Sequence, residues 1–192
     1  MEVHPEIAIR NEQRKTALIL RNGIPKDTRD AFSQFIRKKT IEYLDSISAR
    51  FVHTYIGFQS EVGTRGIIED LFEYGIKVAV PVVRQEHLMS SLLEDLDILQ
   101  EGEFGVPEPN NVKEVSIKGI DAILIPIVAF DGFGMRLGYG KGYYDRFLST
   151  LPLSVRRIGL AFSIQEMDKI PRMPHDQLIN NIITEQSQFF FE

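Results

Sequence analysis

One stretch of the chain, AFDGFGMRLGYGKGYYDRFL (residues 129–148), combines backbone freedom, positive charge and aromatic rings. Glycine occupies every second position of GYGKG (138–142), so backbone amides there can approach a ligand closely or adopt positive φ. Arg136 and Lys141 add positive charge at the same place. These residue types in this spacing favour a phosphate-bearing ligand with an aromatic part.

The segment before the glycines indicates where they lie. AILIPIVAF (122–130) is a continuous apolar run, which predicts a central strand buried on both faces. The glycines then follow the C-terminal end of that strand, where open α/β sheets bind ligands. A helix beginning near Tyr143 would add unpaired N–H groups that attract phosphate.

Common nucleotide-binding motifs do not match. A P-loop requires Ser or Thr after Gly140-Lys141, but Gly142 stands there, and the Rossmann glycine pattern also fails. KGYYDRF partly imitates an RNA-binding signature, yet Asp145 occupies an aromatic position of it. The alternative without a ligand is a tight strand-to-helix connection with glycines at its turns.

Composition narrows the class of protein. The 192 residues, 43% hydrophobic and 26% charged, predict one globular domain (1–192). With 22 basic and 27 acidic residues the net charge is −5, which argues against a nucleic-acid partner. The absence of cysteine excludes disulfides and thiolate sites, and the four histidines lack ligand spacing. No apolar run is long enough to span a membrane and no secretory signal is evident, so we expect a cytoplasmic protein without a membrane partner.

Hydrophobic periodicity predicts alternating helices and strands. The first helix (6–22) presents Ile7, Ala17, Leu18 and Leu20 as apolar residues, with its basic residues on other faces. A parallel strand–helix–strand unit is expected downstream. Residues 84–120 are expected to be less regular, with a surface loop at EGEFGVPEPNN (101–111). The C-terminal segment is expected to end the sheet or cover its edge. The other predicted elements are a helix from Asp27, strands 51–58, 77–83 and 157–163, helices 64–75 and 143–150, and the C-terminal segment 182–191.

The glycine-rich stretch resembles the signature of the 5-formyltetrahydrofolate cyclo-ligase family. Four further segments fall in family order: RNGIPKDTR (21–29), FQSEVGT (58–64), FGVPEP (104–109) and PHD (174–176). The resemblance implies a three-layer α/β/α fold with a mostly parallel central sheet. It also implies conversion of 5-formyltetrahydrofolate and MgATP into 5,10-methenyltetrahydrofolate, ADP and phosphate, through phosphorylation of the formyl oxygen. The expected partners are these small molecules, and we expect a monomer.

The family's triphosphate loop maps onto this sequence residue by residue, with Arg136, Lys141 and Tyr143 as its catalytic members. Tyr143 and Tyr144 are expected to border the pterin ring, the alternative being core packing. Glu61 matches the family's folate-contacting glutamate, the alternative being a carboxylate at a helix start. The implied ATP-binding loop comprises Arg136, Gly138, Gly140, Lys141, Gly142 and Tyr143.

A basic pair on the first helix of the family reaches the ATP phosphates. Arg10 and Arg14 have the matching spacing, with arginine in place of the family's lysine at the first position. Lys15 is the alternative second member if the register shifts by one residue. A solvated helix face is the alternative without function.

The family associates two aspartates with magnesium. Asp145 matches the first, but Asn180 stands at the second, 35 positions later. An amide oxygen can still bind Mg²⁺, although without negative charge. The resemblance therefore predicts a weakened site, in which Asn180→Asp would lower the magnesium requirement.

Two other functions stay open at this point. A sugar-phosphate isomerase or a CoA-handling enzyme on a related α/β scaffold would explain the phosphate loop, but not the paired tyrosines or an ATP requirement. A non-catalytic folate- or nucleotide-binding module would explain the loop and the loss of the second aspartate. Metal-dependent product formation separates the module from the enzyme.

Overall fold

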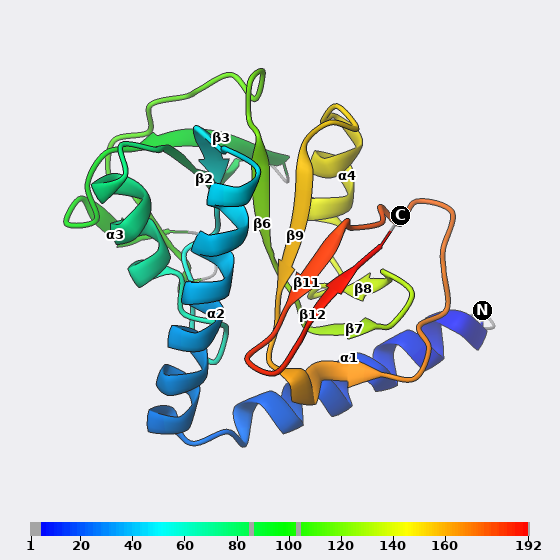
Figure 1. The fold of residues 1–192 in the computed structure, drawn as a ribbon. Coiled ribbons are helices and arrows are strands. Elements are labelled where there is room, and N and C mark those ends of the chain that lie inside the picture. Colours follow the sequence, from blue (N-terminus) through cyan, green and yellow to red (C-terminus); the bar gives the residue numbers. More distant parts are fainter. Residues whose placement is uncertain (1–4, 85–86, 103–104, 192) are drawn as a thin grey trace.

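The computed structural model describes residues 5–84, 87–102 and 105–191. Its centre is a seven-stranded sheet of order β12-β11-β9-β6-β1-β2-β3 (Figure 1). The five inner strands run parallel, and β12 and β3 pair antiparallel at the two edges. The strands are β1 (Phe51–His53), β2 (Lys77–Arg84), β3 (His87–Leu93), β6 (Ala122–Pro126), β9 (Arg156–Leu160), β11 (Asn181–Ile183) and β12 (Gln188–Phe190).

Helices cover both faces of this sheet because its inner strands are apolar on both sides. The helices are α1 (Pro5–Asn22), α2 (Lys26–Ser46), α3 (Arg65–Glu73) and α4 (Tyr143–Ser149). Along β6, Leu124 packs with α2 and α3, whereas its neighbours Ile123 and Ile125 pack with α4 on the opposite face. Each such fully buried side chain contributes about 2 kcal/mol. The expected three-layer α/β/α fold with a mostly parallel sheet is confirmed.

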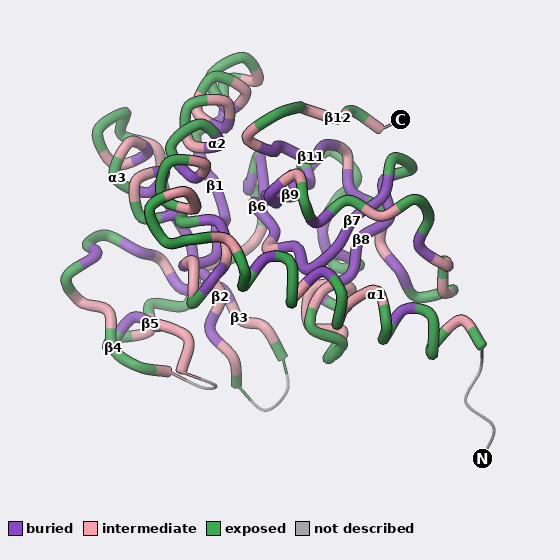
Figure 2. Tube along the Cα trace, turned by 90° about the horizontal axis from the view of Figure 1, so that it is seen from below, coloured by how far each residue is buried: buried purple, intermediate pink, exposed green. Residues whose placement is uncertain are grey.

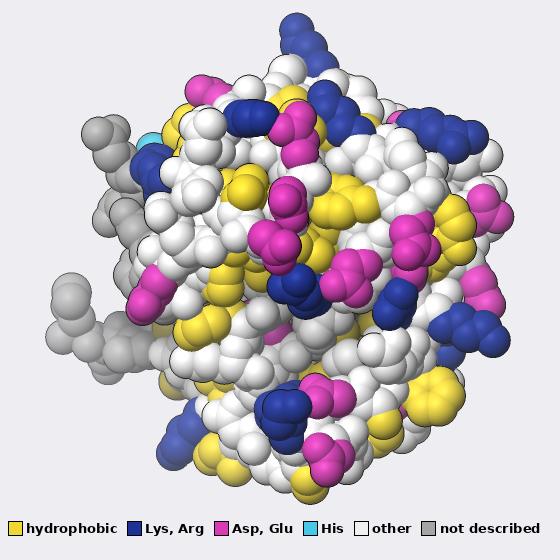
Figure 3. Space-filling view, turned by 90° about the vertical axis from the view of Figure 1, so that its left-hand side faces the viewer, with side chains coloured by type: hydrophobic (Ala, Val, Ile, Leu, Met, Phe, Trp, Pro, Cys, Tyr) yellow, Lys and Arg dark blue, Asp and Glu magenta, His cyan; other side chains and the backbone are white. Residues whose placement is uncertain are grey.

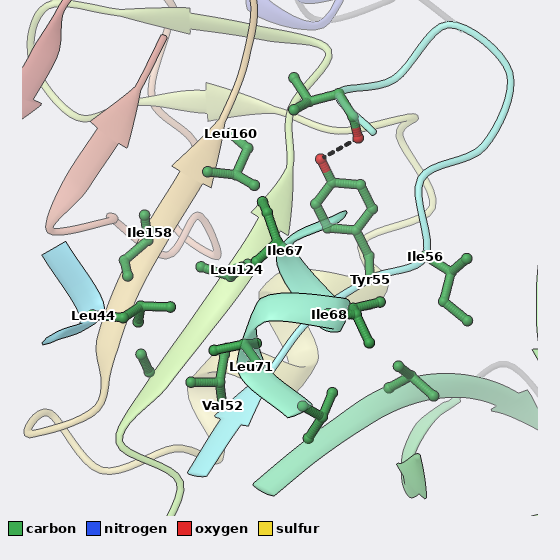
Figure 4. Packing of buried hydrophobic residues seen from close by; sticks show 14 of the residues in the cluster. Leu44, Val52, Tyr55, Ile56, Ile67, Ile68, Leu71, Leu124, Ile158 and Leu160 are labelled. Atoms are coloured by element: carbon green, nitrogen blue, oxygen red, sulfur yellow. Dashed lines mark hydrogen bonds between the residues drawn. The ribbon is translucent and has the colours of Figure 1, made fainter. Parts of the chain in front are cut away.

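The layer formed by α2 and α3 is the larger core cluster. Figure 4 shows Leu44 of α2 and Ile67 and Leu71 of α3 meeting Leu124 of β6 and Ile158 of β9. All five side chains are almost fully buried. The predicted strand–helix–strand unit is confirmed here, since β1 and β2 pair in parallel with α3 between them.

The apolar run 122–130 does not form the single strand that its composition predicts. The strand β6 ends at Pro126, and the chain then turns into a second sheet of order β10-β7-β8. Gln165 makes this break possible, because its side-chain amide donates to the carbonyls of Ile127 (2.7 Å) and Val128 (2.9 Å). The second sheet comprises β7 (Ala129–Asp131), β8 (Arg136–Leu137) and β10 (Glu166–Met167), and the 3₁₀ turn η2 (Ser163–Gln165) precedes β10.

Two other sequence-based boundaries were wrong. The expected strand 51–58 stops at His53, after which the chain runs without ladder pairing. Residues 84–120, expected to be less regular with a loop over 101–111, contain the edge strand β3 and a small hairpin of β4 (Leu99–Glu101) and β5 (Pro107–Pro109). Phe104, part of the FGVPEP segment, lies outside the described residues, as does His4.

Helix α1 lies across the second sheet at one end of the molecule (Figures 1 and 2). Its packed face matches the expected one only in part: Ala17 is buried and Leu18 packs against the same core cluster, but two arginines are buried beside them. Arg10, Ala17 and Arg21 are buried, whereas Ile7 and Leu20 are exposed. The arginines are buried because they find polar partners in other segments of the chain, described below.

The surface over α2 and α3 carries mixed charge. Basic and acidic side chains are interspersed on the face that Figure 3 shows, and ion pairs such as Arg37 with Asp70 and Arg65 with Glu69 lie on these helices. None of the described helices combines the length and apolarity that crossing a bilayer requires.

Candidate active site

A cavity of about 470 Å³ lies at the C-terminal ends of the central strands. Its walls include Tyr55 and Ile56 after β1, Val83 near the end of β2, and Pro126 at the end of β6. The carboxyl ends of parallel strands meet at one edge of a sheet, so the fold itself gathers these residues. Arg136, residues 138–145 and the α1 residues Arg10 and Arg14 complete the lining of the cavity.

The glycine-rich stretch divides into two parts with different roles. Its first part is the β7–β8 hairpin, in which Asp131 Oδ1 accepts the N–H groups of Phe133 (2.9 Å) and Met135 (3.1 Å). Its second part, residues 138–145, lines the cavity. Of the glycines in this stretch, only the alternating three of GYGKG are among the residues that line the cavity.

Two of these glycines have backbone angles that other residues rarely adopt. Gly140 has φ +97° and Gly142 has φ +68°, and Gly142 directly precedes α4. A side chain at either position would strain the backbone. The turn thus depends on glycine for its shape and leaves its amides uncovered by Cβ atoms.

Arginines from α1 form one wall of the cavity. The Arg10 guanidinium donates to both carboxylate oxygens of Asp176, at 2.6 and 2.9 Å, and to the Pro171 carbonyl. Arg14 Nε donates to the Gly138 carbonyl at 2.9 Å, which ties α1 to the glycine segment. Burial lowers the pKa of Arg14, and the nearby Arg10 lowers it further, so a bound anion would relieve this repulsion.

Arg136 lies deeper, at the start of β8, and is 5% exposed. Its Nη2 donates to Asp145 Oδ1 at 2.9 Å, while its buried Nε has no hydrogen-bond partner among the described residues. Burial lowers the pKa of Arg136 and Asp145 opposes that shift, and guanidinium remains charged throughout. An unpaired buried donor on a charged group is costly, which points to a ligand acceptor at this place.

Another part of the cavity lining is aromatic and carries a carboxylate. Glu61 Oε2 accepts the Phe58 N–H (3.0 Å), and Oε1 accepts the Tyr139 hydroxyl (3.1 Å). Burial raises the pKa of Glu61, and these hydrogen bonds together with Arg21 partly oppose the rise. The buried Tyr144 hydroxyl has no partner within the described ranges, and burial raises its pKa strongly. The Tyr55 hydroxyl, by contrast, donates to the Val62 carbonyl (Figure 4).

The structure brings most of the sequence-predicted residues into this one cavity. Lys15 is exposed and Asn180 is half-buried, and neither is among the described residues that line it. Arg14, not Lys15, is therefore the second basic residue of α1 at the cavity. The predicted residues that line the cavity are Arg10, Arg14, Glu61, Arg136, Gly138, Gly140, Lys141, Gly142, Tyr143, Tyr144 and Asp145.

Sequence reasoning missed several residues of the site. Asp176 lies in the PHD segment, but nothing in the sequence indicated that it pairs with Arg10. Arg21 and Tyr139, which bind each other beside Glu61, lie within the quoted segments RNGIPKDTR and GYGKG, but sequence reasoning assigned neither a role. The apolar wall at Val106 and Pro107 follows from the FGVPEP segment, whose resemblance to the family was the only available signal.

Asp145 fits a magnesium site better than Asn180 does. Asp145 lines the cavity, and only its Oδ1 carries described hydrogen bonds, from Arg136 and from the Gln177 N–H. The side-chain oxygen of Asn180 instead accepts the Arg157 N–H at 2.9 Å, beside the β9–β11 ladder. Within the described ranges no three His, Asp or Glu side chains form a ready metal site. One carboxylate together with substrate phosphates is nevertheless a common magnesium arrangement.

Comparison with curated proteins matches the sequence to named enzymes. The model of the 5-formyltetrahydrofolate cyclo-ligase family matches residues 6–185. A 5-formyltetrahydrofolate cyclo-ligase of Mycolicibacterium smegmatis is 31% identical over 182 residues, covering 90% of this chain and 92% of that protein. The enzyme of the same name from Mus musculus is 29% identical over 168 residues, covering 81% of this chain and 83% of that protein.

Solved structures agree with this match. The 5,10-methenyltetrahydrofolate synthetase of Aquifex aeolicus superposes with a TM-score of 0.84 at 26% identity, covering 95% of this chain and 92% of that one. The synthetase of Mycoplasma pneumoniae superposes with a TM-score of 0.77 at 26% identity, covering 92% of this chain and 98% of that one. Fold and sequence therefore agree, and the chain belongs to the 5-formyltetrahydrofolate cyclo-ligase family.

Proposed function

We propose that this chain catalyses the ATP-dependent cyclisation of 5-formyltetrahydrofolate to 5,10-methenyltetrahydrofolate. One observation carries the proposal: a single cavity joins a wall of arginines and glycine amides to a wall of tyrosines around Glu61. The first wall suits a triphosphate and the second a pterin. Each wall also holds a buried donor without a described partner, Arg136 Nε and the Tyr144 hydroxyl.

The reaction has to turn a formamide oxygen into a leaving group. The formyl oxygen attacks the γ-phosphorus of ATP, the bond from phosphorus to ADP breaks, and an iminium phosphate results. The nitrogen at position 10 then bonds to the formyl carbon and loses its proton, and the carbon–oxygen bond breaks to release phosphate. Such phosphoryl transfer needs positioning and charge neutralisation more than a protein nucleophile.

The residues of the cationic wall supply that neutralisation. Arg136 and Lys141 would bind the phosphoryl oxygens, and the amides of residues 138–142 would hold the triphosphate in place. Arg10 and Arg14 extend the positive charge along α1. Magnesium would neutralise part of the triphosphate charge when bound, with Asp145 as its protein ligand.

The tyrosine wall would orient the folate. The Glu61 carboxylate accepts hydrogen bonds, so it can bind the amino and ring N–H groups of the pterin. Tyr143 and Tyr144 also line the cavity, and Tyr144 lies near Glu61. Their rings would border the pterin. This arrangement would place the formyl oxygen toward the phosphates that Arg136 binds.

Several wider features belong to the same proposal. We infer one catalytic domain, a monomeric and cytoplasmic protein, and small molecules as its partners. The formal charge of −5 supports the inference that nucleic acid is not a partner. The family match favours an enzyme over a non-catalytic binding module, and product formation tests that distinction.

The test is an absorbance assay for the methenyl product in the near ultraviolet. Purified protein receives 5-formyltetrahydrofolate, ATP and magnesium, and each component is then omitted in turn. We expect product only when all three are present. Binding of both substrates without product at any magnesium concentration would establish the module instead.

A charge-conserving variant ties that activity to the cavity. Arg136→Lys keeps the positive charge but loses the planar fork of donors, so we expect turnover to fall by about a hundredfold. Arg156→Lys is the matched control, because Arg156 is exposed at the start of β9. Equal turnover of the two variants would remove Arg136 from the active site.

A further inference from the structure

Arg21 is a buried cation whose partners lie in other segments of the chain. It is 2% exposed and lies near the end of α1. Its Nε donates to Ser60 Oγ (3.0 Å), and its Nη2 donates to the Tyr139 hydroxyl (2.7 Å). Its guanidinium also lies 5.7 Å from the centre of the Tyr139 ring. Arg21 therefore holds Tyr139 by both its hydroxyl and its ring.

Tyr139 connects Arg21 to Glu61 by hydrogen bonds. Its hydroxyl accepts from Arg21 and donates to Glu61 Oε1 at 3.1 Å. The other carboxylate oxygen accepts the Phe58 N–H. Both oxygens of Glu61 are thus fixed by donors, which leaves their remaining lone pairs pointing in set directions.

We propose that Tyr139, held by Arg21, is a positioning residue that orients Glu61 for recognition of the pterin. This inference rests on the proposed function, because it assigns Glu61 to the folate. Tyr139 lies between Gly138 and Gly140, within the segment assigned to the triphosphate. The same side chain therefore joins the folate carboxylate to the phosphate-binding segment.

A purely structural role for the Tyr139 hydroxyl fits the geometry poorly. Tyr139 is 55% exposed, and its two neighbours in sequence are glycines that offer no side-chain packing. Removing the hydroxyl takes one acceptor from the buried Arg21, which keeps Ser60 as a partner, and a stability cost alone would not move the acid midpoint of folate binding. Its position between a buried cation and a carboxylate matters mainly for the direction and charge of that carboxylate.

The hydrogen bonds from Arg21 to Tyr139 and from Tyr139 to Glu61 also affect the charge of Glu61. The ionisable groups around this carboxylate are Arg21 of α1, Tyr139 of the glycine segment, Tyr55 after β1 and Tyr144 of α4. Burial raises the pKa of Glu61, while Arg21 and the Tyr139 hydroxyl oppose the rise. Losing the hydroxyl would raise the pKa of Glu61 further. As the pH is lowered, folate binding by the variant should therefore weaken at a higher pH than folate binding by the wild-type protein.

The experiment measures equilibrium binding of 5-formyltetrahydrofolate to Tyr139→Phe, Glu61→Gln and the double variant. Phenylalanine keeps the ring and removes only the hydroxyl. We expect Tyr139→Phe to weaken folate binding about tenfold, with a smaller effect on ATP, and to move the acid midpoint of binding upward. Tyr74→Phe is the matched control, because Tyr74 is exposed at the end of α3.

The double variant decides whether the effect passes through Glu61. We expect Tyr139→Phe to change folate binding less than about twofold when Glu61 is already glutamine. Independent effects that simply multiply, or a Tyr139→Phe protein with wild-type affinity and midpoint, would overturn the positioning role. A wild-type protein that neither binds nor converts folate would instead overturn the proposed function.

Discussion

The Asp176 carboxylate accepts two hydrogen bonds from the Arg10 guanidinium, at 2.6 and 2.9 Å, across 166 positions of the sequence. Both side chains are less than 10% exposed. Burial alone would raise the pKa of Asp176, but the hydrogen bonds from Arg10 and from the Met173 N–H outweigh it and lower that pKa. The pair fixes the start of α1 against the C-terminal segment beside the cavity.

Removing the charge of Asp176 should therefore affect stability and ATP binding together. In Asp176→Asn the buried Arg10 loses its charged partner, and we expect the free energy of unfolding to fall by about 3 kcal/mol. Because Arg10 then loses its fixed direction, the KM for ATP should rise more than that for folate. Chemical unfolding and steady-state kinetics measure the two effects.

The control is Asp30→Asn, which removes the exposed ion pair with Lys26. Its cost should stay below about 1 kcal/mol, since exposed pairs contribute little. Equal stability of the two variants, with an unchanged KM for ATP, would show that the buried pair has neither role.

The structure predicts different effects of two substitutions on the magnesium requirement of the reaction. Asp145→Asn should raise the magnesium concentration needed for half-maximal rate, because it removes the carboxylate at the cavity. Asn180→Asp should leave it unchanged, since the Asn180 side chain binds the Arg157 N–H outside the cavity. This expectation replaces the one drawn from the resemblance alone. A lowered requirement in Asn180→Asp would restore Asn180 as a ligand.

His53 should make the protein less stable in acid. It is fully buried against Phe147, with ring centres 5.0 Å apart, and neither ring nitrogen has a described partner. Burial lowers its pKa from 6.5 to about 3, so the unfolded chain binds a proton that the folded chain excludes. Stability from this group is therefore complete above pH 6.5 and is lost as pH falls toward 3, by at most about 1.4 kcal/mol per pH unit.

His53→Leu should remove that contribution. We expect a flatter dependence of the melting temperature on pH between 4 and 6.5, and stability at pH 7 that is unchanged or raised by about 1 kcal/mol. His87→Leu, at an exposed position of β3, should keep the wild-type slope. An identical slope in all three proteins would show that His53 does not titrate in this way.

The sequence was sufficient for the family, the α/β class and the strand–helix–strand unit around α3, all of which are confirmed. Local patterns carry this information, because apolar periodicity and the glycine spacing are visible within a few residues. The break after Pro126 was not predictable in the same way. It depends on Gln165, nearly 40 positions downstream, which satisfies the carbonyls that the turn exposes.

Helix α1 shows the main limit of periodicity. Its apolar residues suggested a buried apolar face. Arg10 and Arg21 are buried on the packed face as well, because Asp176, Ser60 and Tyr139 accept their hydrogen bonds. Buried charges need partners, and distant partners leave no local signal in a sequence. The composition of the cavity was therefore predictable, but the hydrogen bonding that orients it was not.

The proposed function depends on attack of the formyl oxygen on ATP within this cavity. The most direct measurement uses 5-formyltetrahydrofolate carrying ¹⁸O in its formyl group, with ATP, magnesium and the wild-type protein. We expect the methenyl product to form and the label to appear in inorganic phosphate. Methenyl product accompanied by unlabelled phosphate would contradict it, because the formyl oxygen would then have left without being phosphorylated.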